Sequence, residues 1–167
     1  MAGPNDRGTP RALFDACVRR WGPFDIDVCA HAENAKVQRY WSIEDDGLAQ
    51  DWSGLRCWMN PPYSKKNDSG RPNGCIDKWL AKAVDAAKHG AVVVGLLPND
   101  PSTEWFRYIE DSAAECWWLL GPRLRFEGVG GNGKPLATPT FTNLIAVFRQ
   151  RDKGEKRQGG LWRWRDA

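Results

Sequence analysis

The chain has 167 residues, a length that fits one domain with a substantial buried core. Its formal charge of +3 excludes a strongly basic nucleic-acid binder but leaves DNA open as a partner. The five cysteines are widely spaced and form no Cys-x-x-Cys pair, which argues against a disulfide framework and against a zinc site. No apolar run is long enough to span a membrane, and no signal-peptide core begins the chain. We therefore expect a soluble, cytoplasmic protein with reduced thiols.

The start of the chain predicts one helix and one short strand. Thr9-Pro10 is a helix-start signal, and apolar residues at helical spacing follow it, so we expect a helix over about residues 10–20. Residues 24–28, Phe-Asp-Ile-Asp-Val, alternate apolar and acidic side chains and predict a strand. Asp27 then lies near the carboxyl end of that strand.

Beyond residue 63, helices and strands alternate. The polar stretch 64–74 has no apolar periodicity and predicts an exposed, mildly basic loop. Residues 75–88 carry apolar side chains on one helical face, and residues 91–97 form a continuous apolar run typical of a central parallel strand. A shorter helix and a strand over residues 116–120 continue the alternation. This pattern predicts a doubly wound α/β sheet that is mostly parallel.

The end of the chain departs from this alternation. A strand is predicted over residues 141–148, and no helix separates it from the strand over 116–120, so we expect an antiparallel hairpin at the edge of the sheet. Residues 151–167 are rich in Lys, Arg and Gly and predict a basic, flexible tail. The expected domain therefore covers residues 1–150.

Asn60-Pro61-Pro62-Tyr63 combines a rigid backbone with groups that suit a planar amine. An apolar run over residues 55–59 predicts a buried strand that leads into this turn, and the two prolines fix its backbone. The Asn60 side-chain oxygen and the Pro61 carbonyl can accept both hydrogens of an exocyclic amine such as that of adenine, which frees the nitrogen lone pair. Tyr63 can stack on the ring of a nucleotide flipped out of a duplex.

Two alternatives for this motif need no catalysis. Asn-Pro often begins a turn, and a short proline-rich stretch can serve as a ligand for another domain. The strand that leads directly into Asn60, with further apolar strands and helices on either side, favours a catalytic turn.

Several segments together resemble the phage-type DNA N-6-adenine methyltransferases (Dam-like). They are, in chain order, Thr9-Pro10, residues 24–30, Asp46-Gly47-Leu48 with Trp52, Asn60-Pro61-Pro62-Tyr63-Ser64, a helix with Trp79 and a strand ending in Leu97-Pro98. The resemblance covers roughly residues 9–148 and implies a Rossmann-like methyltransferase sheet. It also implies methyl transfer from S-adenosylmethionine to the exocyclic amine of adenine in DNA, without a metal.

The resemblance also implies roles for individual residues. The catalytic residues that hold the target base would be Asn60, Pro61, Pro62 and Tyr63. The residues that bind the cofactor would be Thr9, Pro10, Asp27, Cys29 and Ala30 around its methionine part and Asp46 at its adenine. On the DNA side, Phe126 would pack against the flipped base, and Lys65, Lys66 and Arg71 would meet phosphates.

For several of these residues a simpler role explains the sequence as well. Asp27 can be a solvated acid at a strand end, and Asp46 can be a turn residue before Gly47. Phe126 can be a core residue, and the basic side chains of the 64–74 loop can be a solvated surface.

We therefore predict an adenine methyltransferase that acts on double-stranded DNA in the cytoplasm, that of a bacterial host if the chain is phage-encoded. One alternative keeps the cofactor but changes the acceptor to an RNA base or a protein amide. The other is a non-catalytic nucleic-acid-binding module that uses its ten tryptophans and basic tail. Because no second domain for target recognition is predicted, we expect a short or loose recognition sequence.

Overall fold

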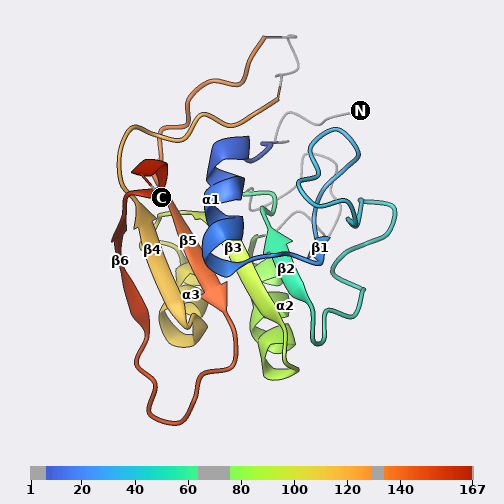
Figure 1. Cartoon of the computed structure of the whole chain (residues 1–167), viewed down its shortest axis with the longest axis vertical. Helices are drawn as coiled ribbons and strands as arrows, with labels where there is room; N and C mark the ends of the chain where they lie inside the picture. The colour runs from blue at the N-terminus through green and yellow to red at the C-terminus, as the bar shows by residue number, and fades with distance from the viewer. Residues whose placement is uncertain (1–6, 64–75, 129–133, 167) are drawn as a thin grey trace.

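The computed structural model describes residues 7–63, 76–128 and 134–166. A six-stranded sheet has the order β1-β2-β3-β5-β4-β6 (Figure 1). Its strands are β1 (Ile26–Asp27), β2 (Arg56–Met59), β3 (Val92–Pro98), β4 (Glu115–Leu119), β5 (Asn143–Phe148) and β6 (Gln158–Trp162). β5 is antiparallel to both of its neighbours, and the other strands share one direction. The predicted mixed α/β class with a mostly parallel sheet is confirmed.

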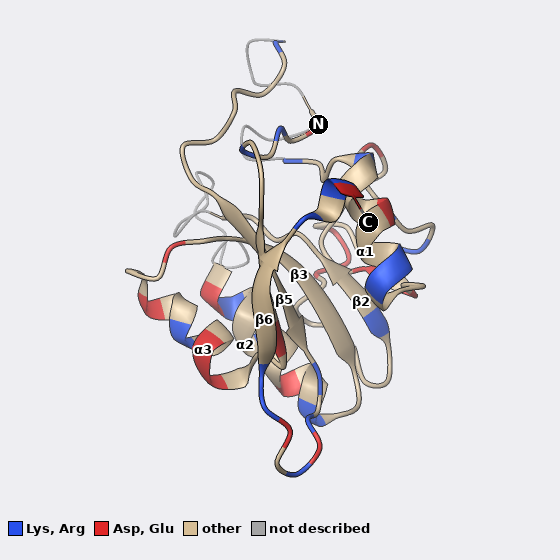
Figure 2. Ribbon diagram, turned by 60° about the vertical axis from the view of Figure 1, so that its left-hand side comes forward, with Lys and Arg blue, Asp and Glu red and all other residues tan. Residues whose placement is uncertain are grey.

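Helices cover both faces of this sheet, with α1 on one face and α2 and α3 on the other (Figure 1). The helices are α1 (Arg11–Trp21), α2 (Ile76–Lys88) and α3 (Arg107–Ser112), with short 3₁₀ turns η2 (Glu104–Phe106) and η3 (Trp164–Asp166). The predicted helices over residues 10–20 and 75–88 are confirmed. Figure 2 shows charged residues gathered on the helices and on the loop before β6, whereas the strands carry few.

The strands bury both of their faces because side chains alternate between the two helical layers. In β2, Trp58 packs with residues of α1, whereas its neighbours Cys57 and Met59 pack with residues of α2. In β5 every residue is buried. A strand that is apolar on both faces is stable only when it is covered on both sides, which explains the continuous apolar runs in the sequence.

The expected antiparallel hairpin forms, but its predicted place at the sheet edge is wrong. β5 pairs antiparallel with β4 and inserts between β4 and β3, so that it lies inside the sheet. The physical reason is the burial of all its residues, which an edge position with one open side would not provide.

The end of the chain is not the flexible tail that its composition suggests. Gln158–Trp162 forms β6, which pairs in parallel with β4 at the edge of the sheet. Trp162 and Trp164 are only 7% and 6% exposed, and the Trp162 ring packs edge-on against Trp21 at 5.1 Å. Burial of two indole rings offsets the entropy lost when this segment becomes ordered.

The carboxyl ends of β1, β2 and β3 lie at the same end of the molecule as the first turn of α1 (Figure 1). This end is where ligands bind in parallel α/β sheets. Among the helices of the described ranges, none is long and apolar enough to cross a membrane.

Candidate active site

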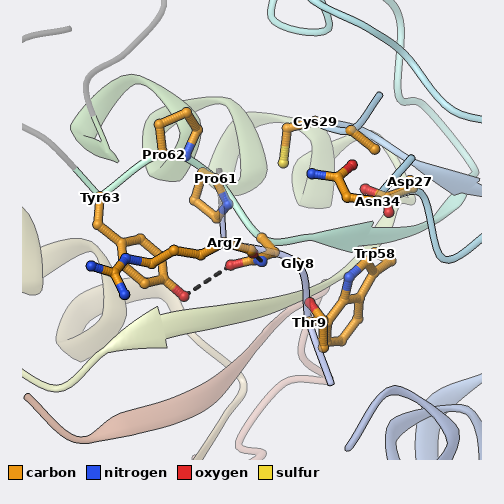
Figure 3. Close-up of a pocket in the computed structure, with 12 residues that line it drawn as sticks. Arg7, Gly8, Thr9, Asp27, Cys29, Asn34, Trp58, Pro61, Pro62 and Tyr63 are labelled. Atoms are coloured by element: carbon orange, nitrogen blue, oxygen red, sulfur yellow. Dashed lines mark hydrogen bonds between the residues drawn. The ribbon is translucent and has the colours of Figure 1, made fainter. Parts of the chain in front are cut away.

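A cavity lies at the carboxyl ends of β1 and β2 and is closed by the segment that precedes α1 (Figure 3). Its lining residues are Arg7, Gly8, Thr9, Asp27, Cys29, Ala30, Asn34, Trp58, Asn60, Pro61, Pro62 and Tyr63. The fold thus brings the complete Asn-Pro-Pro-Tyr turn together with four of the predicted cofactor residues. Those four come from two separate segments of the chain, the one before α1 and the one at the end of β1.

Asn60 is held at both ends of its side-chain amide. Its Nδ2 donates to the Arg7 carbonyl at 2.6 Å, and its Oδ1 accepts from the Tyr63 hydroxyl at 2.9 Å (Figure 3). The Arg7 carbonyl cannot donate, so it fixes the orientation of the amide with the oxygen on the side of Tyr63. Sequence reasoning identified Asn60 but had no signal for the backbone group that orients it.

Tyr63 points into the protein. Its hydroxyl lies 2.9 Å from both Asn60 Oδ1 and the Leu96 carbonyl, two acceptors that compete for one hydrogen. Burial raises the pKa of Tyr63 well above its usual value, so the phenol stays neutral. The oxygen that is predicted to hold the target amine is therefore occupied by Tyr63 in this structure.

Two aromatic rings and a guanidinium group lie around Tyr63. Its ring meets Phe126 edge-on at 6.1 Å and Phe141 edge-on at 5.7 Å. The Arg7 guanidinium carbon lies 5.6 Å and 5.7 Å from the centres of the same two rings, and its Nη1 is buried without a partner. Phe126 is buried and lies next to the motif tyrosine, a position compatible with both of its predicted roles.

Asp27 is a buried acid at the end of β1, with only 3% of its surface exposed. Its Oδ2 accepts from the Lys36 backbone N–H at 3.1 Å. Burial raises the pKa of Asp27 to about 7, against the opposing effect of hydrogen bonds from the Lys36 and Cys29 backbone. The alternative of a solvated strand-end acid is therefore wrong. Thr9, on the other side of the cavity, is also buried, with only 2% of its surface exposed.

The Glu127 carboxylate ties three segments together beside this cavity. It pairs with Lys36 Nζ and accepts from the Arg11 backbone N–H at 2.8 Å in the first turn of α1. The Glu127 backbone also exchanges two hydrogen bonds with Gly8. Because Gly8 and Lys36 belong to segments that border the cavity, Glu127 holds these segments in their relative positions.

Two predicted cofactor residues do not line the cavity. Pro10 is the residue before α1, and its carbonyl accepts from the backbone of the first turn. Asp46 has a left-handed backbone with φ of 50° and accepts from the Ala49 N–H, as a turn residue does. A side chain at the next residue, Gly47, would collide with the carbonyl of Val28, so this turn packs directly on the residue that follows β1. Lys65, Lys66 and Arg71 lie outside the described residues.

Four lining residues were missed by sequence reasoning, namely Arg7, Gly8, Asn34 and Trp58. The available signal for Trp58 was its spacing, because residues two apart in a strand face the same side and Trp58 precedes Asn60 by two. Within the described ranges no cluster of His, Cys, Asp or Glu suits a metal ion, and no disulfide joins the cysteines found there.

A mostly parallel sheet that ends in a cavity with a buried acid and an Asn-Pro-Pro-Tyr turn is consistent with a methyltransferase-like fold. The chain belongs to the DNA N-6-adenine-methyltransferase (Dam) family, whose sequence profile matches residues 5–158. The predicted family is confirmed, and the match extends beyond residues 9–148 to the first residue of β6.

Two phage proteins are similar to this chain along most of its length. It is 35% identical over 147 residues to the DNA N-6-adenine-methyltransferase of Haemophilus phage HP1, which covers 78% of this chain and 80% of the phage protein. It is 30% identical over 165 residues to the DNA N-6-adenine-methyltransferase of Escherichia phage T1, which covers 90% of this chain. The chain spans 65% of the length of that T1 protein.

Proposed function

We propose that this chain transfers a methyl group from S-adenosylmethionine to the N6 amine of an adenine in DNA. One observation carries the proposal: Asn60 and Pro61, which offer acceptors to an amine, line the same cavity as the buried acid Asp27. Family membership supports adenine as the acceptor and DNA as the substrate. An RNA base or a protein amide has no comparable support.

The sheet fits a Rossmann-like methyltransferase arrangement. Helices cover both of its faces, and the parallel strands β1 and β2 end at the cavity. This is the region of a doubly wound sheet that receives a nucleotide cofactor.

The residues of the cavity fit the amino-acid end of the proposed cofactor. The buried Asp27 carboxylate can accept from an ammonium group, which would compensate for its removal from water. Thr9 adds a buried hydroxyl, and Cys29 and Ala30 are small enough for close approach of a ligand. When bound, S-adenosylmethionine supplies a methyl group on a positively charged sulfur, so the reaction needs no metal to activate the donor.

Asn60 and Pro61 bind the amine of the target adenine, which receives the methyl group. Their oxygens accept the two amine hydrogens and draw the nitrogen lone pair out of conjugation with the ring. Because the Tyr63 hydroxyl donates to Asn60 Oδ1, it must release that oxygen when the base enters. The Leu96 carbonyl is a second acceptor that can retain the hydroxyl.

The target adenine must leave the duplex to reach this cavity. Stacking on Tyr63 and Phe126 would offset part of the cost of unstacking, about a few kcal/mol. Lys65, Lys66 and Arg71 would contact phosphates, and such contacts position DNA without reading its sequence. We expect a short or loose target sequence for this reason.

Methyl transfer from labelled S-adenosylmethionine tests the proposal. Wild-type protein should label adenine N6 in DNA, and Asn60→Ala should reduce the rate roughly 10²–10³-fold, as loss of one positioned hydrogen-bonding group does in other enzymes. Binding of S-adenosylhomocysteine by the variant, measured by calorimetry, is the control for folding and should not change.

Two outcomes would contradict the proposal. Wild-type protein that labels RNA or protein but leaves DNA unlabelled would exclude DNA as the acceptor. Equal labelling of DNA by Asn60→Ala would remove Asn60 from the mechanism.

A further inference from the structure

Trp58 is a completely buried residue of β2 whose indole ring borders the cavity. It lies opposite Asp27 in the parallel register of β1 and β2, so both side chains are on the α1 side of the sheet. The ring packs edge-on against Phe14 at 5.3 Å and lies 5.6 Å from Phe24. These contacts leave the ring little freedom to turn.

The indole Nε1 of Trp58 is buried and has no hydrogen-bond partner. Two other tryptophans have an acceptor for this group: Trp52 donates to the Gly47 carbonyl at 2.8 Å, and Trp21 donates to Glu115 at 3.1 Å. A buried donor without an acceptor is costly and uncommon in folded proteins. An indole N–H can only donate, so a ligand that pairs with it must carry a hydrogen-bond acceptor.

The position of Trp58 Nε1 indicates which ligand group pairs with it. In Figure 3 the nitrogen side of the indole faces the cavity, between Asp27 and the Gly8–Thr9 segment. A buried acceptor, Asp27, and a buried donor, Trp58, therefore border one space. This pair is complementary to an α-amino acid, which carries one ammonium and one carboxylate on the same carbon. α1 begins at Arg11, two residues after Thr9, and a helix N-terminus also favours a negative group.

We propose that Trp58 Nε1 donates a hydrogen bond to the carboxylate of the methionine part of the methyl donor, while Asp27 accepts from its ammonium. This inference rests on the proposed function, because it assumes that the cavity receives S-adenosylmethionine. It makes Trp58 a specificity residue for the amino-acid end of the cofactor, in addition to its packing under α1.

Two ligands separate the amino-acid end from the nucleoside. S-adenosylhomocysteine carries the ammonium and carboxylate, and 5′-methylthioadenosine lacks both. By calorimetry, Trp58→Phe should bind S-adenosylhomocysteine about tenfold more weakly than wild type, the loss expected for one hydrogen bond to a charged group. Its affinity for 5′-methylthioadenosine should equal that of wild type. The matched control is Trp21→Phe, which removes an indole N–H already paired with Glu115 and should change neither affinity.

A second measurement keeps the test decisive if Trp58→Phe does not fold. In ¹⁵N-labelled wild-type protein, S-adenosylhomocysteine should move the Trp58 indole N–H resonance downfield, and its decarboxylated analogue should not. Equal shifts with both ligands would contradict the proposal.

Failure of this inference is distinguishable from failure of the proposed function. Wild-type protein that binds no S-adenosylhomocysteine would contradict the proposed cofactor. Wild-type binding with an equal affinity in a folded Trp58→Phe variant would leave the function standing and overturn the role of Trp58.

Discussion

The two halves of the cavity differ in how their polar groups are satisfied. The base half comprises Asn60, Pro61, Pro62 and Tyr63. Here Asn60 Oδ1, the oxygen proposed to accept from the target amine, already has a hydrogen-bond partner, because the Tyr63 hydroxyl donates to it. The other half would bind the methyl donor, and we call it the donor half; it comprises Thr9, Asp27, Cys29, Ala30 and Trp58. In this half the indole N–H of Trp58 has no hydrogen-bond partner, and burial raises the pKa of Asp27. A ligand therefore completes the donor half but must displace an internal contact in the base half. We expect the cofactor to bind without DNA.

Asp27→Asn should produce the largest change in the donor half. Loss of the charge that faces the ligand ammonium should weaken S-adenosylhomocysteine binding about 10–100-fold, the range for a hydrogen bond to a charged group. Because burial raises the pKa of Asp27 to about 7, wild-type affinity should fall as the pH decreases below that value. Calorimetry from pH 5.5 to about 8 should show this slope in wild type and not in the variant. A slope that persists in Asp27→Asn would assign it to another group.

The same substitution should change how stability depends on pH when no ligand is bound. The pKa of Asp27 is raised from 3.8 to about 7, so the folded state holds a proton that the unfolded state has lost. Its contribution to stability is therefore fully present below about pH 4 and is lost as the pH rises to about 7, at up to about 1.4 kcal/mol per pH unit. Urea unfolding of both proteins at several pH values should show this difference. Parallel curves would contradict the burial of a titrating Asp27.

Glu127→Gln should have a smaller effect, also in the donor half. The substitution removes the ion pair with Lys36 but leaves an oxygen for the Arg11 backbone N–H. Because the Glu127 side chain is half exposed, we expect a loss of about 0.2–1 kcal/mol of stability and a few-fold weaker binding of S-adenosylhomocysteine. Glu110→Gln, which breaks a pair with Arg157, is the matched control and should leave ligand affinity unchanged. Equal affinities in both variants would show that Glu127 does not hold the donor half in place.

Tyr63→Phe should have the smallest effect on function, and it acts on the base half. Removal of the hydroxyl leaves the Asn60 and Leu96 oxygens without this donor, at a cost of about 1 kcal/mol of stability in thermal or urea unfolding. The phenyl ring remains available for stacking, and Asn60 Oδ1 no longer has to be released. Methylation of DNA should therefore keep its rate within a few-fold of wild type. A loss of 100-fold or more would mean that the hydroxyl acts during the reaction, in addition to its contacts with Asn60 and Leu96.

Much of the fold could be predicted because its signals are local. Helical spacing identified α1 and α2, and the apolar run over residues 91–97 identified β3 to within one residue at each end. The order of the strands was harder to predict, since the position of β5 depends on which surfaces remain to be covered. β6 was missed because its Gly-rich and Lys/Arg-rich surroundings resemble those of a flexible end. Its stability comes from Trp162 and Trp164, whose partners lie far away in the chain.

The candidate site was predicted unevenly for the same reason. Thr9, Asp27, Cys29, Ala30 and Asn60–Tyr63 were found through a motif and a family resemblance, and all of them line one cavity. Arg7 was missed because it acts on Asn60 through its backbone carbonyl, a group that every residue has. Asp46 was predicted to reach the cofactor's adenine, but it is not one of the residues that line the cavity.

By itself the sequence determined the chemistry available to this protein. Two prolines fix the turn at residues 60–63, an amide and a carbonyl offer acceptors, and an acid ends a short strand. Only the tertiary structure decided what each group faces. The parallel register of β1 and β2 places Trp58 opposite Asp27, and the segment before α1 brings Arg7 to Asn60 across 53 positions of sequence. Register and burial arise from packing between distant segments, so no local pattern records which donors are satisfied and which remain for a ligand.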